Sequence, residues 1–221
     1  MTDLPPREVT QALGHEPRDP ALFLTALTHS SHAGDSYQRL EFLGDRVLGL
    51  VMGEWLFALF PAEPEGQLSR RLNALVSGET CAEIARDLDL GRHLRLGKQA
   101  RDDGAQFSTY VLGDVVEALI GALFLEAGID GARAFIRKAW GDRVHAQGKA
   151  PKHPKAELQE YVAAKQWRPP VYEVTHRGGP HHAPVFTITV SIPGRMSAEG
   201  KGTSKQEAET EAARAMLKEL K

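Results

Sequence analysis

The sequence has 221 residues, of which 42% are hydrophobic and 25% are charged. That length is enough for one large domain or two ordinary ones, and the composition excludes a wholly disordered chain. The single cysteine, Cys81, excludes an internal disulfide and a zinc site made of cysteines, which suits the reducing cytoplasm. The first residues lack the basic and apolar segments of a signal peptide, so we expect a cytoplasmic protein.

The formal net charge of −2 combines two parts of opposite sign. Residues 1–146 carry 15 basic and 21 acidic side chains, a net −6, whereas residues 147–221 carry 12 and 8, a net +4. The acidic part could hold cations and the basic part could bind phosphates, although chance variation between domains would give the same split. Glycine and proline gather between residues 141 and 154, which predicts a linker, placed here at 147–153, before a second domain over 154–221.

Residues 1–146 have the pattern of a helical domain. Asp19 can accept a hydrogen bond at a helix start, and Pro20 needs no hydrogen-bond acceptor in the first turn. No stretch of this part alternates apolar and polar residues as a strand does. We therefore predict an all-α domain with helices over residues 20–30, 36–60, 79–89, 108–127 and 130–146.

Two of the expected helices are apolar almost all round. We therefore predict that residues 40–60 and 111–127 are buried helices. The charged residues within 40–60 make that segment a poor membrane span. Glycines such as Gly44 and Gly121 are costly inside helices, and a close approach of the two helices would explain them.

Four carboxylates lie within these apolar helices. At about 100° per residue, Gln38, Glu41 and Asp45 share one face of the first helix, and Asp114 and Glu117 share a face of the second. Buried like charges need compensation, either from nearby arginines or from a divalent ion. Oxygen ligands suit Mg²⁺ or Mn²⁺ rather than Zn²⁺. Spacing alone also allows the alternative that these acids have no joint role.

Three segments resemble the ribonuclease III family. Residues 38–45, QRLEFLGD, resemble its signature ERLEFLGDS; residues 26–31, ALTHSS, resemble the segment that precedes the signature; and residues 113–122, GDVVEALIGA, resemble its second acidic motif. The signature is long and specific, and the resemblance implies a metal-dependent endoribonuclease that cuts double-stranded RNA.

The resemblance assigns Glu41, Asp45, Asp114 and Glu117 as Mg²⁺ ligands, with Mn²⁺ able to substitute, and Asp45 and Glu117 as catalytic. It further implies a homodimer with one site per strand, products with 5′-phosphate and 3′-hydroxyl ends and short 3′ overhangs, and substrates among rRNA, tRNA and mRNA precursors. We expect no membrane association.

Two positions depart from the signature. Gln38 stands where the family usually has Glu, and Arg46 stands where it usually has Ser. Gln38 brings no charge and could weaken a second-metal role, whereas Arg46 could pair with a carboxylate or a phosphate. Neither change removes an expected ligand, so activity is still predicted, with both residues as modulators of the site.

Residues 154–221 have an α-β-β-β-α pattern, typical of a small α+β domain. Ser204 and Glu207 form the pattern of a capping box at the start of the last helix, for which we predict a core stripe of Ala208, Ala212, Ala215, Met216 and Leu220. The expected elements are helix 155–166, strands 171–177, 184–192 and 195–201, and helix 204–220.

This part resembles the double-stranded RNA-binding domain over its whole length. The matching segments are residues 158–161, residues 179–186 and residues 200–205. The resemblance implies minor-groove contacts by Gln159, Glu160 and His182 and phosphate contacts by Lys201 and Lys205, which read the shape of A-form RNA more than its sequence. Gln206 replaces the usual basic residue and should weaken phosphate contact.

Three functions are compatible with the whole chain. The first is an active endoribonuclease specific for double-stranded RNA. The second is a catalytically impaired RNA-binding regulator, which only Gln38 favours. The third is a metal phosphohydrolase with another substrate that uses its second domain as a tether, which the specificity of the signature disfavours. The four carboxylates favour the first.

Overall fold

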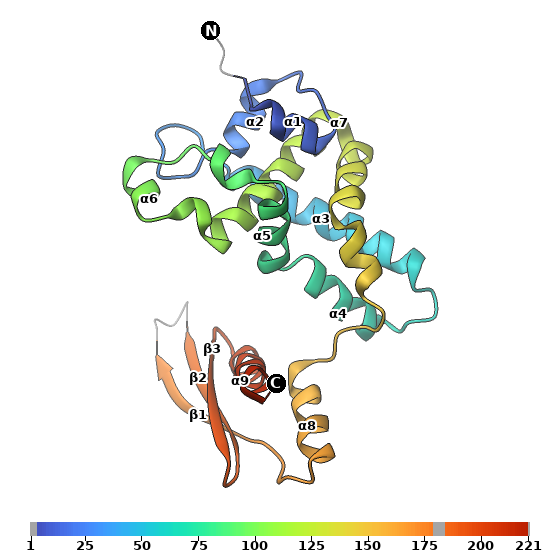
Figure 1. Ribbon diagram of the computed structural model, residues 1–221, viewed down its shortest axis with the longest axis vertical. Helices are drawn as coiled ribbons and strands as arrows, with labels where there is room; N and C mark the ends of the chain where they lie inside the picture. The colour runs from blue at the N-terminus through green and yellow to red at the C-terminus, as the bar shows by residue number, and fades with distance from the viewer. Residues whose placement is uncertain (1–3, 179–183, 221) are drawn as a thin grey trace. The chain divides into compact units, whose positions relative to one another are not determined.

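The computed structural model describes residues 4–178 and 184–220, and the chain divides into two compact units, residues 1–151 and 152–221 (Figure 1). Each unit has its own hydrophobic core. The division falls within the segment 147–153 for which the composition predicts a linker. His182 lies outside the described residues.

The first unit is helical, as predicted. Asp19 begins the second helix as expected, since its Oδ1 accepts a hydrogen bond from the Ala21 amide at 3.1 Å. That helix ends earlier than expected, and among the described residues of this unit the only β-type pairing is a single bridge between Thr28 and Arg95. The helices are α1 (Arg7–Leu13), α2 (Pro20–Ala26), α3 (Gln38–Leu59), α4 (Glu65–Leu75), α5 (Gly78–Asp87), α6 (Lys98–Asp102) and α7 (Thr109–Ala146), with 3₁₀ turns at Leu90–His93 and Ala105–Phe107.

Helices α3 and α7 pack against each other at very short range in the middle of this unit (Figure 1). A Cβ atom on Gly44 would lie 1.7 Å from the carbonyl oxygen of Glu117, and one on Gly121 would lie 2.3 Å from that of Leu40. Only glycine permits this main-chain contact. The close approach that the helical glycines predict is therefore confirmed at these two positions.

Helix α7 is bent at Gly128, whose φ of 68° lies in the left-handed region. This bend corresponds to the gap between the two helices predicted over 108–127 and 130–146. The second half of α7 is anchored by Trp140, a fully buried side chain whose Nε1 donates a hydrogen bond to the Leu75 carbonyl at 2.7 Å. Leu75 ends α4, so this bond joins α7 to a helix that the sequence analysis does not predict.

Helix α4 owes its position to a buried arginine. The Arg71 side chain is 1% exposed, and its Cζ atom lies 3.7 Å from the centroid of the Phe60 ring. Its guanidinium donates hydrogen bonds to both carboxylate oxygens of Glu63, at 2.6 and 2.7 Å. Its Nη1 also donates to the Gln147 carbonyl at 2.6 Å, and Arg70 Nε donates to the Pro151 carbonyl at 2.8 Å. The segment that follows α7 is thus held on α4.

The second unit is the predicted α-β-β-β-α domain. Its elements are α8 (Pro154–Ala164), β1 (Val171–Gly178), β2 (Val185–Ile192), β3 (Met196–Gly202) and α9 (Lys205–Leu220). The strands form one antiparallel sheet in the order β1-β2-β3, and residues of α8 and α9 share a core with the sheet (Figure 1). Phe186, Ile188 and Val190 are buried on one face of β2, as predicted.

The buried face of α9 differs in part from the predicted stripe. Ala208, Ala212 and Met216 are buried as expected. Ala213 and Leu217 are also buried, whereas Ala215 and Leu220 only border the core. The helix therefore faces the sheet with a stripe rotated from the predicted one, because the sheet rather than the helix pattern sets which small residues are covered.

No helix among residues 4–178 and 184–220 is both long enough and apolar enough to cross a membrane.

Candidate metal centre and RNA-binding surface

Three of the four predicted ligands converge between α3 and α7. Glu41, Asp114 and Glu117 each offer a carboxylate oxygen, and these atoms lie within 4.8 Å of one another. All three side chains are half-buried. The main-chain contact at Gly44, one turn after Glu41, brings the two helices close enough for carboxylates from both to meet.

Electrostatics within this cluster disfavour the charged state of its members. Burial raises the pKa of Glu117 to about 8, and the charges of Asp45, Asp114 and Glu41 act in the same direction. The pKa of Glu41 is raised by burial and then by the charges of Asp114 and Asp45. The pKa of Asp114 is raised by burial, against the opposing effects of the Tyr37 hydroxyl and of His29. The surrounding protein groups thus do not fully compensate the negative charge of these carboxylates, and a bound cation would stabilise their charged state.

Asp45 lies in the same electrostatic environment but has a different partner. It lies one turn after Glu41 on α3, and its charge raises the pKa of both Glu41 and Glu117. Its Oδ2, however, accepts a hydrogen bond from Nη1 of Arg46. The sequence allowed Arg46 to pair with a carboxylate, and the structure shows that pairing. The Arg46 side chain is 68% exposed, so it can leave Asp45 without disturbing the core.

Two neighbours of the cluster were not predicted as site residues. The buried Tyr37 hydroxyl donates to Asp114 Oδ2 at 3.0 Å, and the Cys81 thiol lies 3.9 Å from Glu117 Oε1. Cys81 is fully buried in α5, as the sequence predicts for a small helix residue. Tyr37 directly precedes the signature, and that adjacency is the one sequence signal that could have indicated it.

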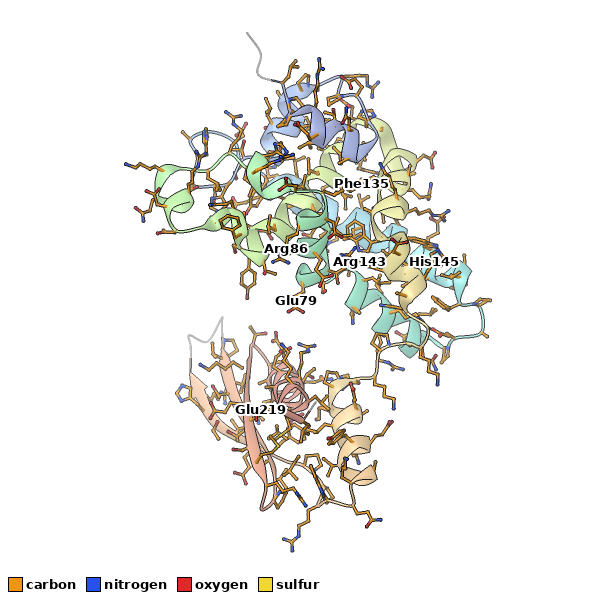
Figure 2. All side chains as sticks on the ribbon, viewed as in Figure 1. Glu79, Arg86, Phe135, Arg143, His145 and Glu219 are labelled. Atoms are coloured by element: carbon orange, nitrogen blue, oxygen red, sulfur yellow. The ribbon has the colours of Figure 1, made fainter. Side chains whose placement is uncertain are left out.

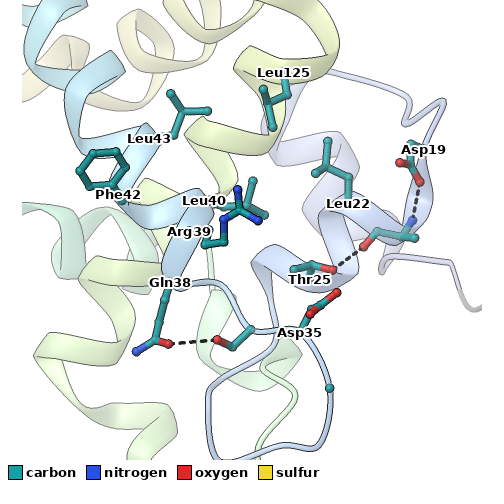
Figure 3. A pocket seen from close by; sticks show the side chains of 13 residues that line it. Asp19, Leu22, Thr25, Asp35, Gln38, Arg39, Leu40, Phe42, Leu43 and Leu125 are labelled. Carbon is teal, nitrogen blue, oxygen red and sulfur yellow. Dashed lines mark hydrogen bonds between the residues drawn. The ribbon is translucent and has the colours of Figure 1, made fainter.

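The Gln38 side-chain amide is bonded to a neighbouring serine. Its Oε1 accepts a hydrogen bond from the Ser36 hydroxyl at 3.3 Å, and it lines a groove of about 1070 Å³ between α2 and α3 (Figure 3). Phe42, Leu43 and Leu125 also line this groove.

Four of the five predicted RNA-binding residues are described, and all four are exposed. Gln159 and Glu160 lie on α8, Lys201 lies on β3 and Lys205 begins α9. Glu160 forms an ion pair with Lys152, so RNA would compete with that lysine for it. His182, the fifth, is not among the described residues.

The predicted cap of α9 is present with one change. The Ser204 hydroxyl accepts a hydrogen bond from the Glu207 amide at 3.1 Å, as in a capping box. The Glu207 carboxylate returns to the amide and hydroxyl of Thr203, at 2.7 and 2.6 Å, rather than to Ser204. These bonds lower the pKa of Glu207. They fix the turn that presents Lys205.

Comparison with known families identifies both units. Residues 19–142 match the family model described as ribonuclease-III-like, and residues 154–220 match that of the double-stranded RNA binding motif. These matches agree with the division of the chain into two units and with the position of the carboxylate cluster in the first.

Individual relatives cover nearly the whole chain. Ribonuclease 3 of Zymomonas mobilis is 62% identical over 209 residues, which are 95% of this chain and 85% of that protein. Ribonuclease 3 of Rhodopseudomonas palustris is 46% identical over 95% of this chain and 79% of that protein. The nuclease domain of ribonuclease III from Campylobacter jejuni has a similar structure, with a TM-score of 0.59 and 38% identity over 61% of this chain and 98% of that domain. The chain therefore belongs to the ribonuclease III family.

Proposed function

We propose that Glu41, Asp45, Asp114 and Glu117 bind Mg²⁺, and that this centre hydrolyses the strands of double-stranded RNA. The observation that carries the proposal is the convergence of three of these carboxylates within 4.8 Å, in a chain that belongs to an endoribonuclease family. A set of oxygen donors suits Mg²⁺, with Mn²⁺ as a substitute. When bound, the ion would supply Lewis-acid stabilisation of negative charge at the scissile phosphate.

The protein's own residues would hold and orient the reacting groups. Glu41 and Asp114 approach from opposite helices, and the Tyr37 hydroxyl fixes one oxygen of Asp114 while leaving the other free to bind. Asp45 and Glu117 are the proposed catalytic carboxylates. On substrate binding Arg46 would release Asp45 and turn to a phosphate, since a guanidinium forms strong paired hydrogen bonds with phosphate oxygens.

Residues 154–221 would hold the duplex, and residues 147–153 would connect them to the catalytic domain over residues 1–146. Gln159, Glu160 and His182 would contact 2′-hydroxyl groups, and Lys201 and Lys205 would contact phosphates. Such contacts recognise the shape of an A-form duplex. Precursors of rRNA and tRNA and structured mRNAs in the cytoplasm fit this recognition, and the products would carry 5′-phosphate and 3′-hydroxyl ends.

Cutting both strands with short 3′ overhangs needs two centres, which we propose a homodimer supplies. The outer face of α3 exposes large apolar side chains: Phe42 is 65% exposed, Leu50 66% and Phe57 74%. Leu125 of α7, 57% exposed, lines the same groove as Phe42 (Figure 3). An apolar surface of this kind marks a protein interface, and a second copy of this chain is the proposed partner.

The proposed function is tested by incubating the protein with an end-labelled RNA duplex and, separately, with the matching single strand. With Mg²⁺ we expect cleavage of the duplex alone, to products that a 5′-phosphate-dependent exonuclease degrades. Addition of EDTA should abolish cleavage, because the carboxylates then have no ion to hold. Tight binding of the duplex without cleavage in Mg²⁺ or Mn²⁺ would contradict the proposal and support an RNA-binding regulator.

Replacing Lys205 with Ala should weaken duplex binding without slowing the cleavage of bound duplex. One phosphate contact fewer should reduce the slope of log affinity against log salt by about 1. Fluorescence anisotropy with a labelled duplex at several salt concentrations measures this slope. Lys165→Ala, an exposed lysine at the C-terminal end of α8, is the matched control and should leave the slope unchanged. Equal slopes for all three proteins would remove Lys205 from the phosphate contacts.

A further inference from the structure

Tyr110 is an exposed aromatic residue close to the carboxylate cluster along α7. Its side chain is 84% exposed, although it lies in the first turn of a long helix with an extensively buried surface. The neighbouring positions Leu112 and Val115 supply the buried contacts, at 2% and 0% exposure. The fold therefore does not need the Tyr110 ring for its core.

The position of Tyr110 places it on the helix face that carries the carboxylates. It precedes Asp114 by four residues and Glu117 by seven. At about 100° per residue, its direction from the helix axis is within roughly 40° of that of Asp114 and 20° of that of Glu117. Along this face the side chains pass from the half-buried Glu117 to the half-buried Asp114 and then to the exposed Tyr110. Tyr110 thus lies where the carboxylate-bearing face of α7 becomes exposed to solvent.

A positive charge lies beside the start of this helix. Arg86 of α5 (Figure 2) donates a hydrogen bond from Nη2 to the Thr109 hydroxyl at 2.9 Å. This bond holds the guanidinium next to the residue before Tyr110. Tyrosine combines an apolar ring with a hydroxyl that can donate or accept. An exposed ring, a hydroxyl and a guanidinium together suit a sugar-phosphate backbone, whose ribose is partly apolar and whose phosphates are anionic.

We infer that Tyr110 contacts the RNA strand next to the scissile phosphate, with its ring against a ribose and its hydroxyl bonded to a 2′-hydroxyl or a phosphate oxygen. The inference rests on the proposed function, because the carboxylates of the same helix face define where the strand lies. Tyr110 takes no part in bond making or breaking. It sets the position of the strand and therefore acts on substrate binding more than on the rate of the bound complex.

Single-turnover cleavage of an RNA duplex over a range of protein concentrations separates these two effects. For Tyr110→Ala we expect the half-saturating protein concentration to rise about tenfold, because the variant loses one hydrogen bond to a charged group. The maximal cleavage rate should stay within about twofold of that of the unchanged protein. Tyr110→Phe, which keeps the ring, should lie between this variant and the unchanged protein. Phe107→Ala is the matched control, since Phe107 is 76% exposed but precedes α7, and it should behave like the unchanged protein.

A crosslinking measurement reads the contact without any cleavage. With p-benzoylphenylalanine in place of Tyr110, irradiation in EDTA should crosslink the full-length protein to the duplex within a few nucleotides of the cleavage position, whereas the same group at Phe107 should not. Absence of this crosslink, or equal effects of Tyr110→Ala and Phe107→Ala, would overturn the inference. The unchanged protein is assayed on the same duplex and supplies the cleavage position. If it cuts normally, such a result overturns the inference and leaves the proposed function intact; if it does not cut, the proposed function fails, and the inference that rests on it fails as well. A changed sedimentation coefficient of Tyr110→Ala with unchanged cleavage would assign the residue to a protein contact instead and would equally overturn the inference.

Discussion

Replacing Glu117 with Gln is expected to reduce duplex cleavage by about a thousandfold or more while leaving duplex binding nearly unchanged. The amide keeps the shape of the side chain but removes the negative charge from the most perturbed carboxylate of the cluster. Lewis-acid stabilisation by a correctly held ion is worth several kcal/mol, and each 1.4 kcal/mol or so is a factor of about ten in rate. Single-turnover rates in Mg²⁺ measure the loss, and anisotropy in EDTA measures the binding.

Thermal unfolding separates a lost metal site from a damaged fold. In EDTA near neutral pH the Glu117→Gln variant should unfold at about the same temperature as the unchanged protein, because a carboxyl whose pKa is about 8 is already largely protonated there and Gln keeps its shape. Mg²⁺ should stabilise the unchanged protein, by about 2.7 kcal/mol when its concentration is 100 times the dissociation constant, and should stabilise the variant much less. Glu8→Gln, an exposed site on α1, is the matched control for both measurements. Full cleavage by Glu117→Gln would remove this residue from the centre.

A single methyl group at Gly44 should destabilise the first unit more than any surface substitution. Its Cβ would lie 1.7 Å from the Glu117 carbonyl oxygen, and because that atom belongs to the main chain it cannot turn aside. Helices α3 and α7 must therefore separate. We expect Gly44→Ala to lose about 3 kcal/mol of unfolding free energy, at the upper end of the cost of overpacking a core. Denaturant titration followed by circular dichroism measures the loss.

Gly141→Ala is the control for this substitution. Gly141 also lies inside a helix, α7, but a Cβ there meets nothing within 4 Å. Alanine favours helix over glycine by about 1 kcal/mol, so this variant should be slightly more stable than the unchanged protein. If Gly44→Ala were as stable as Gly141→Ala, the close contact between α3 and α7 would be wrong. Cleavage by Gly44→Ala should fall as well, since Glu41 and Glu117 lie on the helices that separate.

The sequence predicts those parts of the fold in which local pattern and burial agree. The apolar segments that became α3 and α7 are continuous, and the alternation of strand β2 buries the residues that it predicts. Helix α4 was missed because its sequence is polar and its principal buried side chain is Arg71. Burial of that arginine depends on Glu63, Phe60 and the Gln147 carbonyl, which come together only in the folded chain.

In the candidate site, too, local sequence pattern predicts some features, whereas others depend on contacts made only in the folded chain. Helical spacing and the family motif predicted which carboxylates share a face, and three of the four lie in one group. Spacing could not show that Asp45 pairs with Arg46, or that Gln38 turns toward Ser36, because both are choices of side-chain rotamer. Nor could it show the bond from Tyr37 to Asp114, which joins residues 77 positions apart in the sequence.

The contact between α3 and α7 also bears on how such a chain can change over generations. At Gly44 and Gly121 the two helices meet through main-chain atoms, which every amino acid shares. The contact between the two main chains therefore sets the distance between Glu41 and Glu117, and the sizes of the surrounding apolar side chains do not. Leucine, valine and methionine elsewhere in the core can be exchanged in an evolving lineage with little effect on the spacing of the carboxylates, provided that the two glycines are inherited together.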